Sequence, residues 1–508
     1  MSTRRTAPHK TRRPASGSRR AKPEAMRRTI VHLTAEYYPY ARTGGLAEAV
    51  AGLATFQARA GDQVVVFMPL YSLVRETAPD LEPIGPACMI AIGPRLEEVR
   101  FYRADRVTDG PQVIFVDAPA YFKRAGLYGE NGADYPDNDR RFALFARAAL
   151  EGIVRFVPGP VLVHAHDWHT ALAPVYARTY DALLERFAGT PFVVSVHNAG
   201  YQGHFPESAM ADLGLPWELW TLDHLEWYGK LNVLKGGLTS CDMAVTVSPT
   251  HARELCTPEG GFGLHHTFQD LGDRLVGIIN GIDQEVWNPA ADQYIATHYS
   301  RDDLAGKAVC KAALQHSFGL AERPTVPLFG MTGRLVKQKG FDIILESARV
   351  RTYDAQFVFL GEGEPGYRAA LSSLAAERRD AVAVDFAFTD VLEHRLMAGS
   401  DIVLMPSLYE PCGLTQLRAQ RYGAPVVGRR VGGIRDTVQD DVTGFLFDDF
   451  TPAALDGAID RALARSANRR AWTATMRRAM ASDFGWERAA SSYAGVYAQA
   501  DRLASTRR

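Results

Sequence analysis

The sequence has little that would place the protein in a membrane or hold it together by disulfides. It contains no run of about eighteen apolar residues, the length that a membrane-spanning helix requires. Its five cysteines are scattered, odd in number and without a CxxC pair. We therefore expect a reducing, cytoplasmic location, no membrane contact and no zinc site built from cysteines.

Acidic residues are almost missing from the start of the chain. Residues 1–28 carry ten of the 57 Lys and Arg residues but only Glu24 of the 58 Asp and Glu residues, so the rest has a formal charge of about −10. A segment with so little to bury is predicted to be a disordered basic tail. It could be a nucleic-acid-binding arm or a transit peptide. We favour a dispensable extension, because Met26 opens a natural first strand, and nucleic acid is not an expected partner.

The body of the sequence contains two series of short apolar runs that alternate with amphipathic stretches. The first series comprises 29–36, 63–69, 112–118, 161–167, 192–198 and 243–249. The second begins near residue 326 and comprises "VPLFGMTG", "QFVFLGEG", "VAVDFAF", "DIVLMPS" and "PVVGRRVGG". Strands that alternate with helices in this way predict a parallel sheet with helices on both faces.

Two such series predict two doubly wound, Rossmann-like α/β domains. We expect an N-terminal domain over residues 29–279, a hinge over 280–294 and a C-terminal domain over 295–483. A last helical segment, 484–508, is expected to cross back to the first domain. Polar or small residues follow each predicted strand, so the site is expected in the cleft where the carboxyl ends of the two sheets meet.

The stretch "RTGGLAEAV" follows the first predicted strand and its loop. Gly44 and Gly45 permit close backbone approach, the following helix would point its amides at an anion, and Arg42 adds charge. A tight turn between a strand and a helix would also use glycines. By itself, the motif is therefore consistent with either a phosphate site or a plain turn.

Two other motifs suggest cofactors that we do not expect. "HAHDWHT" gathers His164, His166, Asp167 and His169, which are metal-ligand types, but the spacing differs from the HxHxDH of binuclear metallohydrolases. We favour a strand end that hydrogen-bonds a polar substrate, without a metal. "GEGEPG" (361–366) matches the dinucleotide fingerprint, but its two glutamates would oppose a pyrophosphate. We interpret it as a glycine-rich turn and expect no cofactor.

Two motifs of the second series suit a diphosphate. "GRLVKQKG" places Arg334 and Lys339 after a strand, where two cations can neutralise a phosphate leaving group without a metal. In "LYEPCGLTQL", Glu410 precedes a turn and residues 413–415 offer amides at a helix start, although the carboxylate could instead cap that helix. The two motifs together are much more specific than either alone.

The full set of motifs resembles that of the bacterial glycogen synthases and plant starch synthases, which have the GT-B glycosyltransferase fold. The matching stretches keep the family order over about residues 29–500 and are "RTGGLAE", "ENGADYPDNDRRFALF", "HAHDWHTALAP", "VHNAGYQGHF", "LKGGLTSCDMAVTVSPT", "GIINGIDQEVWNP", "GRLVKQKGFD", "YEPCGLTQL" and "VGGIRDTV". The resemblance implies a retaining hexosyltransferase that moves glucose from ADP-glucose to the non-reducing 4-hydroxyl of an α-1,4-glucan.

The resemblance also implies roles for individual residues. Arg334 and Lys339 would neutralise the diphosphate, and Glu410 would hold glucose hydroxyls. The His197 carbonyl would face the developing oxocarbenium ion, and the leaving phosphate would accept the proton of the acceptor. The substrate-binding residues that the resemblance implies are Arg42, Gly44, Gly45, Tyr135, Asp167, Asn198, Asn280, Phe388, Thr389, Cys412, Gly413, Leu414 and Thr415. Of these, Phe388 and Thr389 would contact the nucleotide base.

The chain departs from the family at positions that concern the donor. The usual lysine of the first motif is Arg42, the frequent aspartate is Glu48, and Phe388–Thr389 replaces the commonest aromatic–histidine pair. Because arginine is larger, planar and forked, we expect an effect on donor preference and rate more than on reaction type. ADP-glucose is the expected donor, with UDP-glucose or a different acceptor as the alternative.

Two hypotheses from other classes are less well supported. A glucan-binding homologue with a decayed transferase site would not be expected to retain Arg334, Lys339, Glu410 and His197. A nicotinamide oxidoreductase would rest on "GEGEPG" alone.

Overall fold

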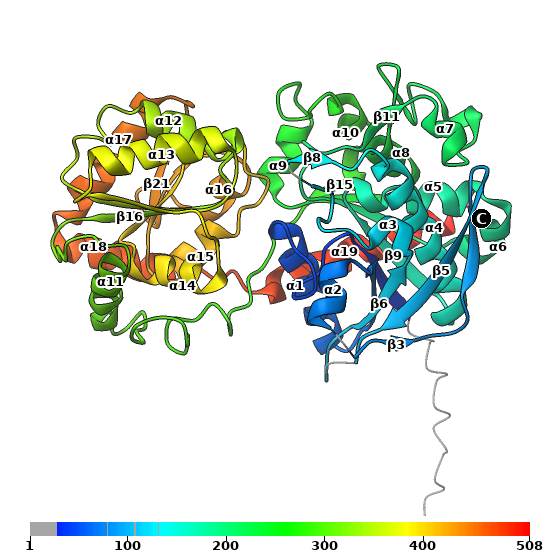
Figure 1. The fold of residues 1–508 in the computed structure, drawn as a ribbon, viewed down its shortest axis with the longest axis horizontal. Helices are drawn as coiled ribbons and strands as arrows, with labels where there is room; N and C mark the ends of the chain where they lie inside the picture. Colours follow the sequence, from blue (N-terminus) through cyan, green and yellow to red (C-terminus); the bar gives the residue numbers. More distant parts are fainter. Residues whose placement is uncertain (1–27, 79, 106–107, 131, 508) are drawn as a thin grey trace, which may run out of the picture.

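The computed structural model describes residues 28–507 except 79, 106, 107 and 131, and these form two α/β lobes (Figure 1). The predicted basic tail, residues 1–28, lies outside the described residues apart from Arg28. Each lobe contains one large sheet with helices around it. The predicted pair of doubly wound, Rossmann-like domains is confirmed.

The sheet of the first lobe has the strand order β15-β14-β10-β9-β1-β2-β6-β5-β3, with β4 paired to β5. Neighbouring strands from β15 to β6 run parallel, whereas β5 is antiparallel to β6, β3 and β4. The strands are β1 (Thr29–Leu33), β2 (Gln63–Pro69), β3 (Glu82–Pro83), β4 (Cys88–Ile92), β5 (Arg95–Arg103), β6 (Gln112–Asp117), β9 (Val161–His166), β10 (Phe192–Val196), β14 (Met243–Thr246) and β15 (Leu275–Gly277).

The sheet of the second lobe is wholly parallel, in the order β18-β17-β16-β19-β20-β21. Its strands are β16 (Leu328–Thr332), β17 (Gln356–Leu360), β18 (Val382–Asp385), β19 (Ile402–Met405), β20 (Val426–Arg429) and β21 (Gly444–Phe447). Two small antiparallel sheets belong to the first lobe. They comprise β7 (Gly129–Glu130) with β8 (Ala133–Asp134), and β11 (His204–Pro206) with β13 (Lys230–Asn232) and β12 (Glu226–Trp227).

Helices connect the parallel strands. Those before the second sheet are α1 (Gly45–Arg59), α2 (Ser72–Thr77), α3 (Pro119–Phe122), α4 (Asn138–Phe156), α5 (Leu172–Thr179), α6 (Asp181–Phe187), α7 (Ala209–Asp212), α8 (Val233–Ser240), α9 (Pro249–Leu255), α10 (His265–Leu271) and α11 (Ala305–Ser317). The later ones are α12 (Phe341–Glu346), α13 (Pro365–Glu377), α14 (Asp390–Gly399), α15 (Thr415–Arg421), α16 (Gly432–Thr437), α17 (Pro452–Ser466), α18 (Arg469–Met480) and α19 (Trp486–Ser505). Short 3-10 turns occur at Trp168–Thr170, Trp217–Leu219, Gly272–Arg274 and Lys337–Lys339.

The order of the parallel strands fixes where each sheet can bind a ligand. In the second sheet the sequence order of the strands is 3-2-1-4-5-6, so the direction of winding reverses between β16 and β19. The first sheet winds in the same way and reverses between β1 and β9. Ligands of open parallel sheets bind outside the carboxyl ends of the strands at such a reversal. All four loops at these points contain motifs that the sequence singled out.

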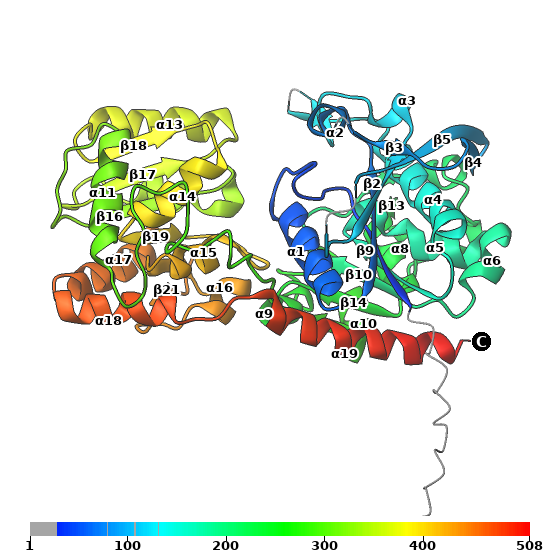
Figure 2. The same ribbon diagram turned by 90° about the horizontal axis from the view of Figure 1, so that it is seen from below.

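The last helix, α19, lies along the first lobe (Figure 2). Its buried aromatic residues share an apolar cluster with Ile30 of β1 and Met243 of β14. Trp486 lies so close to Gly52 of α1 that a Cβ at that glycine would overlap the indole ring. A glycine is therefore required here for close approach of the two helices.

Candidate active site

The two strand-order reversals meet at the boundary between the lobes. A Cβ built on Gly45, at the start of α1, would lie 3.7 Å from Cδ1 of Leu414, which precedes α15 in the second lobe. An Arg334 Nη1 lies 3.5 Å from the hydroxyl of Tyr201, across the same boundary. The fold thus brings the glycine motif of the first lobe against both diphosphate-type motifs of the second.

The loop before α1 is anchored by Glu36, a buried carboxylate that belongs to none of the predicted motifs. Its oxygens accept hydrogen bonds from the Thr43 amide (2.6 Å), the Thr43 hydroxyl (2.7 Å) and the Tyr128 hydroxyl (2.6 Å). Gly44 then precedes the helix, and none of the described atoms would lie within 4 Å of a Cβ there. The helix start is therefore held firmly while the space beside Gly44 stays open.

Arg42 bridges the two lobes. Its guanidinium pairs with Asp390 of the second lobe, and its Nη1 lies 3.4 Å from Glu48 of α1. It also lies 5.6 Å from the ring centre of Tyr38 and 6.0 Å from that of Phe388. The planar fork reaches two carboxylates at once, which the single ammonium of a lysine does less well.

A second ionic bridge lies beside the first. Arg418 of α15 donates to both oxygens of Glu393 at 2.9 and 3.0 Å and also pairs with Glu48 across the boundary. Its guanidinium lies 4.1 Å from the ring centre of Trp287. Because Arg418 and Glu393 are buried, these bonds replace the water that the charges lose.

Lys339 and Glu410 form an ion pair of 2.7 Å at the centre of the second-lobe site. The Glu410 side chain is 6% exposed and also accepts a hydrogen bond from Ser407 at 3.0 Å, whereas the Lys339 side chain is 22% exposed. Lys339 thus touches both the carboxylate and solvent. Arg334 is exposed, so its charge is also open to a ligand.

The loop after Glu410 depends on two glycines beneath it. A Cβ on Gly432 would overlap the Glu410 carbonyl, and one on Gly433 would overlap that of Cys412. Gly413 has a φ of +74°, a conformation that favours glycine. The thiol of Cys412 is buried, which raises its pKa to about 12. This thiol is therefore a neutral part of the loop and no nucleophile.

Asp167 fixes the backbone at His197. Its Oδ1 accepts a hydrogen bond of 2.7 Å from the His197 amide, and its own amide donates to the Ser195 carbonyl at 2.8 Å. Its φ of +56° is unusual for a residue with a side chain and commonly marks a functional site. Burial raises the pKa of Asp167 to about 7. The carboxyl group thus holds the end of β10, where the resemblance puts the reacting sugar.

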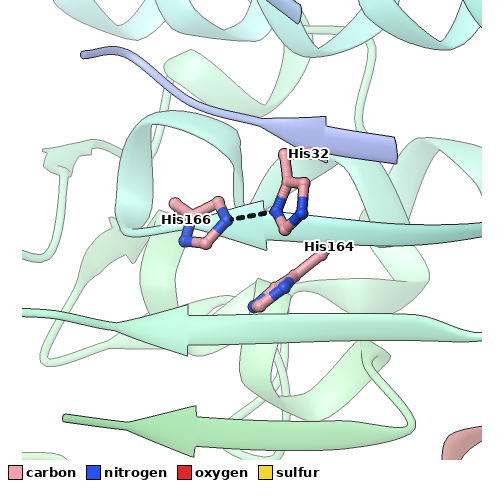
Figure 3. A group of neighbouring side chains, drawn as sticks. All are labelled: His32, His164 and His166. Carbon is pink, nitrogen blue, oxygen red and sulfur yellow. Dashed lines mark hydrogen bonds between the residues drawn. The ribbon is translucent and has the colours of Figure 1, made fainter. Parts of the chain in front are cut away.

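A chain of neutral histidines runs from the sheet interior to His197. Figure 3 shows two of its members, His32 and His166, beside His164. The Nε2 atom of His32 hydrogen-bonds Gln57 at 2.8 Å, and its Nδ1 atom hydrogen-bonds Nε2 of His166 at 3.0 Å. The Nδ1 atom of His166 lies 3.0 Å from Nε2 of His197. Burial lowers the pKa values of His32 and His197 to about 4 and that of His166 well below its usual range. Neutral rings linked in this way fix the orientation of the His197 ring.

The histidines of "HAHDWHT" do not converge on one point. His164 and His166 group instead with His32, and every ring nitrogen of this trio is engaged, since His164 contacts Tyr497 at 2.9 Å and Ser195 at 2.7 Å. His169 stacks against Trp168 and Tyr128. The trio has ligand atoms within 4.8 Å of one another, but a metal would have to displace hydrogen bonds on every ring.

Asn198, Asn280 and Thr415, three other predicted binding residues, lie near the loop that contains Tyr409 and Cys412. Asn198 accepts a bond from the Gly200 amide at 3.0 Å and lies beside the Tyr409 hydroxyl. Asn280 is buried, and its backbone contacts the Cys412 thiol. Thr415 opens α15.

Three further predicted binding residues make contacts within their own lobe, and one of them, Phe388, also lies near the other lobe. Thr389 uses its hydroxyl to cap α14, accepting from the Leu392 amide at 3.2 Å. The Tyr135 ring lies 4.8 Å from the guanidinium groups of both Arg124 and Arg141. Phe388 is half-buried and joins the second-lobe core, so its ring is fixed next to Arg42.

The glycines of "GEGEPG" serve packing. A Cβ on Gly361 would overlap the Gly333 carbonyl, and one on Gly363 would lie 2.5 Å from the Leu335 carbonyl. The Leu335 amide in turn donates to the residue 362 carbonyl at 2.7 Å. The glycine-rich turn therefore supports the loop that contains Arg334.

Sequence reasoning missed Glu36, Tyr201, Asp390, Tyr409 and Arg418. Glu36 anchors Thr43, which lies between the predicted residues Arg42 and Gly44, and each of the others contacts a predicted site residue or bridges the lobes. Tyr409 adjoins a predicted residue in the chain, which was a usable signal. The partners of Asp390 and Arg418 in the other lobe, Arg42 and Glu48, lie 348 and 370 positions away, so no local pattern could reveal these two bridges.

Comparisons with known proteins agree with this geometry. Residues 29–270 match the family model described as the starch synthase catalytic domain, and residues 315–479 match that of glycosyl transferases group 1. The chain is 42% identical over 486 residues to glycogen synthase 2 of Geobacter sulfurreducens, covering 94% of this chain and 99% of that protein. It is 40% identical over 483 residues to the glycogen synthase of Koribacter versatilis, covering 93% and 98%.

Solved structures show the same likeness. The catalytic domain of starch synthase IV from Arabidopsis thaliana, bound to ADP and acarbose, superimposes with a TM-score of 0.87 at 31% identity, covering 94% of this chain and 100% of that one. Sucrose-phosphate synthase from Thermosynechococcus elongatus has a TM-score of 0.60 at 18% identity, covering 93% and 99%, which indicates a shared fold alone. The predicted GT-B fold is confirmed. Within the part of the chain that the structure describes, no helix is long and apolar enough to cross a membrane.

Proposed function

The chain belongs to the glycogen and starch synthase family of glycosyltransferases, and we propose that it transfers glucose from ADP-glucose to the non-reducing 4-hydroxyl of an α-1,4-glucan, with retention of configuration. The main support for this proposal is the meeting of the two strand-order reversals, each with its own motif, at one boundary. Such a pair of facing sites suits a reaction that joins a donor and an acceptor.

The diphosphate of the donor would bind to the second lobe. Arg334 supplies an exposed cation, Lys339 supplies a partly exposed one, and the start of α15 supplies backbone amides. Cations and amides that face the charge formed as the glycosidic bond breaks lower the barrier without a metal or a general acid. The open space beside Gly44 allows the start of α1 to approach the same phosphates.

Binding of the donor would divide the Lys339–Glu410 pair between two partners. Lys339 would turn toward the phosphates, because it is the more exposed member of the pair. The Glu410 carboxylate would then accept hydrogen bonds from glucose hydroxyls, with Ser407 still donating to it. The pair thus keeps a buried charge satisfied until the donor arrives.

The developing oxocarbenium ion would face the backbone at His197. The Asp167 carboxyl group holds the amide of this residue, and the histidine chain holds its ring. A rigidly held carbonyl dipole stabilises positive charge without reorganisation. The acceptor hydroxyl would attack on the same face that the diphosphate leaves, and the leaving phosphate would take its proton.

We also propose the domain limits given above, with a hinge over 280–294. No strand or helix occurs between the end of β15 and the start of α11, and all of these residues are described. The bridges from Arg42 and Arg418 would limit how far the lobes separate.

The test is incorporation of radiolabelled glucose into glycogen by the purified protein. Parallel reactions contain ADP-glucose or UDP-glucose. Incorporation from ADP-glucose at the higher kcat/KM supports the proposal. A higher kcat/KM with UDP-glucose would show that the donor is UDP-glucose, while the proposed reaction would still hold. No incorporation from either donor would refute the proposed function.

A further inference from the structure

The hairpin turn between β12 and β13 exposes an aromatic ring at a strained position. Tyr228 is 81% exposed and has a φ of +49°, and Gly229 follows with a φ of +76°. Two central residues with positive φ make a type I′ turn, which favours Asn-Gly because other side chains are strained there. A tyrosine at this place strains the backbone and exposes an apolar ring to water, and both raise the free energy of the folded state. We therefore expect the residue to have a function.

The ring of Tyr228 is the outer member of an ordered cluster. Trp227 meets it edge to face, with ring centres 4.8 Å apart, and stacks on the exposed His204 at 4.2 Å. The Trp227 indole donates to the Gly263 carbonyl at 3.1 Å, and a Cβ on Gly263 would lie only 2.7 Å from the indole. Trp227 and the His204 ring stacked on it are therefore held in place before any ligand arrives, and the Tyr228 ring packs against the edge of this pair.

This cluster is continuous with the candidate active site. Phe262, next to Gly263, has its ring centre 5.0 Å from that of Tyr409, which precedes Glu410 across the lobe boundary. The Phe262 carbonyl accepts a hydrogen bond of 3.0 Å from the buried Gln202 side chain.

The Gln202 side chain belongs to a small buried network. Asn232 donates to Gln202 at 2.7 Å and lies 3.0 Å from His204. One hydrogen-bonded network thus ties the outer rings to the residue that meets the second lobe.

We propose that His204, Trp227 and Tyr228 form a platform that binds a segment of the α-1,4-glucan acceptor some distance from the end being extended. This inference rests on the proposed function. A glucan chain presents apolar C–H faces that can cover exposed aromatic rings, while its hydroxyls stay in water. Because Gly263 and Phe262 link the platform to Tyr409, a glucan chain that covers the platform would extend toward the site.

The decisive variant is Tyr228→Asn, because it removes the ring and installs the residue that the turn prefers. The fold is therefore expected to be retained, with an unchanged or higher melting temperature. We expect the dissociation constant for glycogen, measured by affinity electrophoresis without donor, to rise about fivefold. The ratio of kcat/KM for glycogen to kcat/KM for maltotriose should fall by a similar factor.

Two further variants test whether the aromatic ring itself is what binds the glucan. Tyr228→Phe keeps the ring and should keep glycogen affinity. Leu222→Ala removes a side chain that is 76% exposed in the loop before β12, and it should leave the affinity for glycogen unchanged.

Wild-type affinity in Tyr228→Asn would overturn the platform, as would a wild-type protein that binds no glycogen. A change of oligomeric state in that variant, seen by sedimentation, would also overturn it and identify a protein interface. Failure of the proposed function looks different: the wild type would then transfer no glucose even to maltotriose.

Discussion

Replacing Lys339 by glutamine should both destabilise the second lobe and slow the reaction. Removal of one member of a fully buried ion pair costs ~3–5 kcal/mol, whereas an exposed pair contributes ~1 kcal/mol or less. The Lys339 side chain is 22% exposed and that of Glu410 6%, and Ser407 still donates to the carboxylate. We therefore expect a cost of ~2 kcal/mol, which lowers the melting temperature of a domain of this size by about 4–8 °C.

Calorimetry on a double-mutant cycle measures this coupling. Glu410→Gln alone should cost less, because the lysine it leaves unpaired can reach water. The double variant should be more stable than the sum of the two single effects predicts, by ~1 kcal/mol or more. Lys337→Gln is the matched control, since it removes an exposed lysine from the same turn. Additive effects, or an equal shift in the Lys337 variant, would refute the coupled pair.

Further predictions concern the lobe boundary, the histidine chain, the helix crossing and the first residues. Arg42→Lys should change the ratio of kcat/KM for ADP-glucose to that for UDP-glucose, because a single ammonium group cannot bind two carboxylates as the planar guanidinium does. An unchanged ratio would show that the arginine has no effect on donor preference. Stability should fall as the pH drops from 6.5 toward 4, by up to ~1.4 kcal/mol per pH unit for each buried histidine such as His32, because only the unfolded chain takes up these protons. A flat acid-unfolding profile would contradict that. Gly52→Ala should lower the melting temperature by overlap with Trp486, whereas an unchanged value would show that the two helices can move apart. Deletion of residues 1–25 should leave transfer activity unchanged, and a large drop would refute the dispensable extension.

The sequence predicted the parts of the fold whose signal is local. Buried parallel strands are continuous apolar runs, so "VLVHAH" and "QFVFL" were recognisable without any partner. β5, "RLEEVRFYR", mixes charged and apolar residues, lies between β6 and the short outer strands β3 and β4, and was missed. The two-residue strands and those of the small three-stranded sheet offered too few residues for a pattern.

The site divides in the same way. Residues within a motif, such as Arg334 and Lys339, were identifiable because their spacing around a turn carries the chemistry. What they contact was not identifiable, because contacts across the lobes depend on how the two sheets face each other. Arg42 illustrates the difference, since the sequence indicated an anion site and the structure adds a carboxylate partner, Asp390, from the other lobe.

The proposed mechanism depends on Lys339 and Arg334 stabilising the leaving diphosphate without a metal. The initial rate of glucose transfer from ADP-glucose to glycogen in the presence of EDTA, measured for the wild type and for Lys339→Ala, tests this dependence. We predict that EDTA leaves the wild-type rate unchanged and that Lys339→Ala lowers it by about 100-fold or more while its melting curve stays cooperative. A wild-type rate abolished by EDTA, or a near-normal rate in Lys339→Ala, would contradict the mechanism.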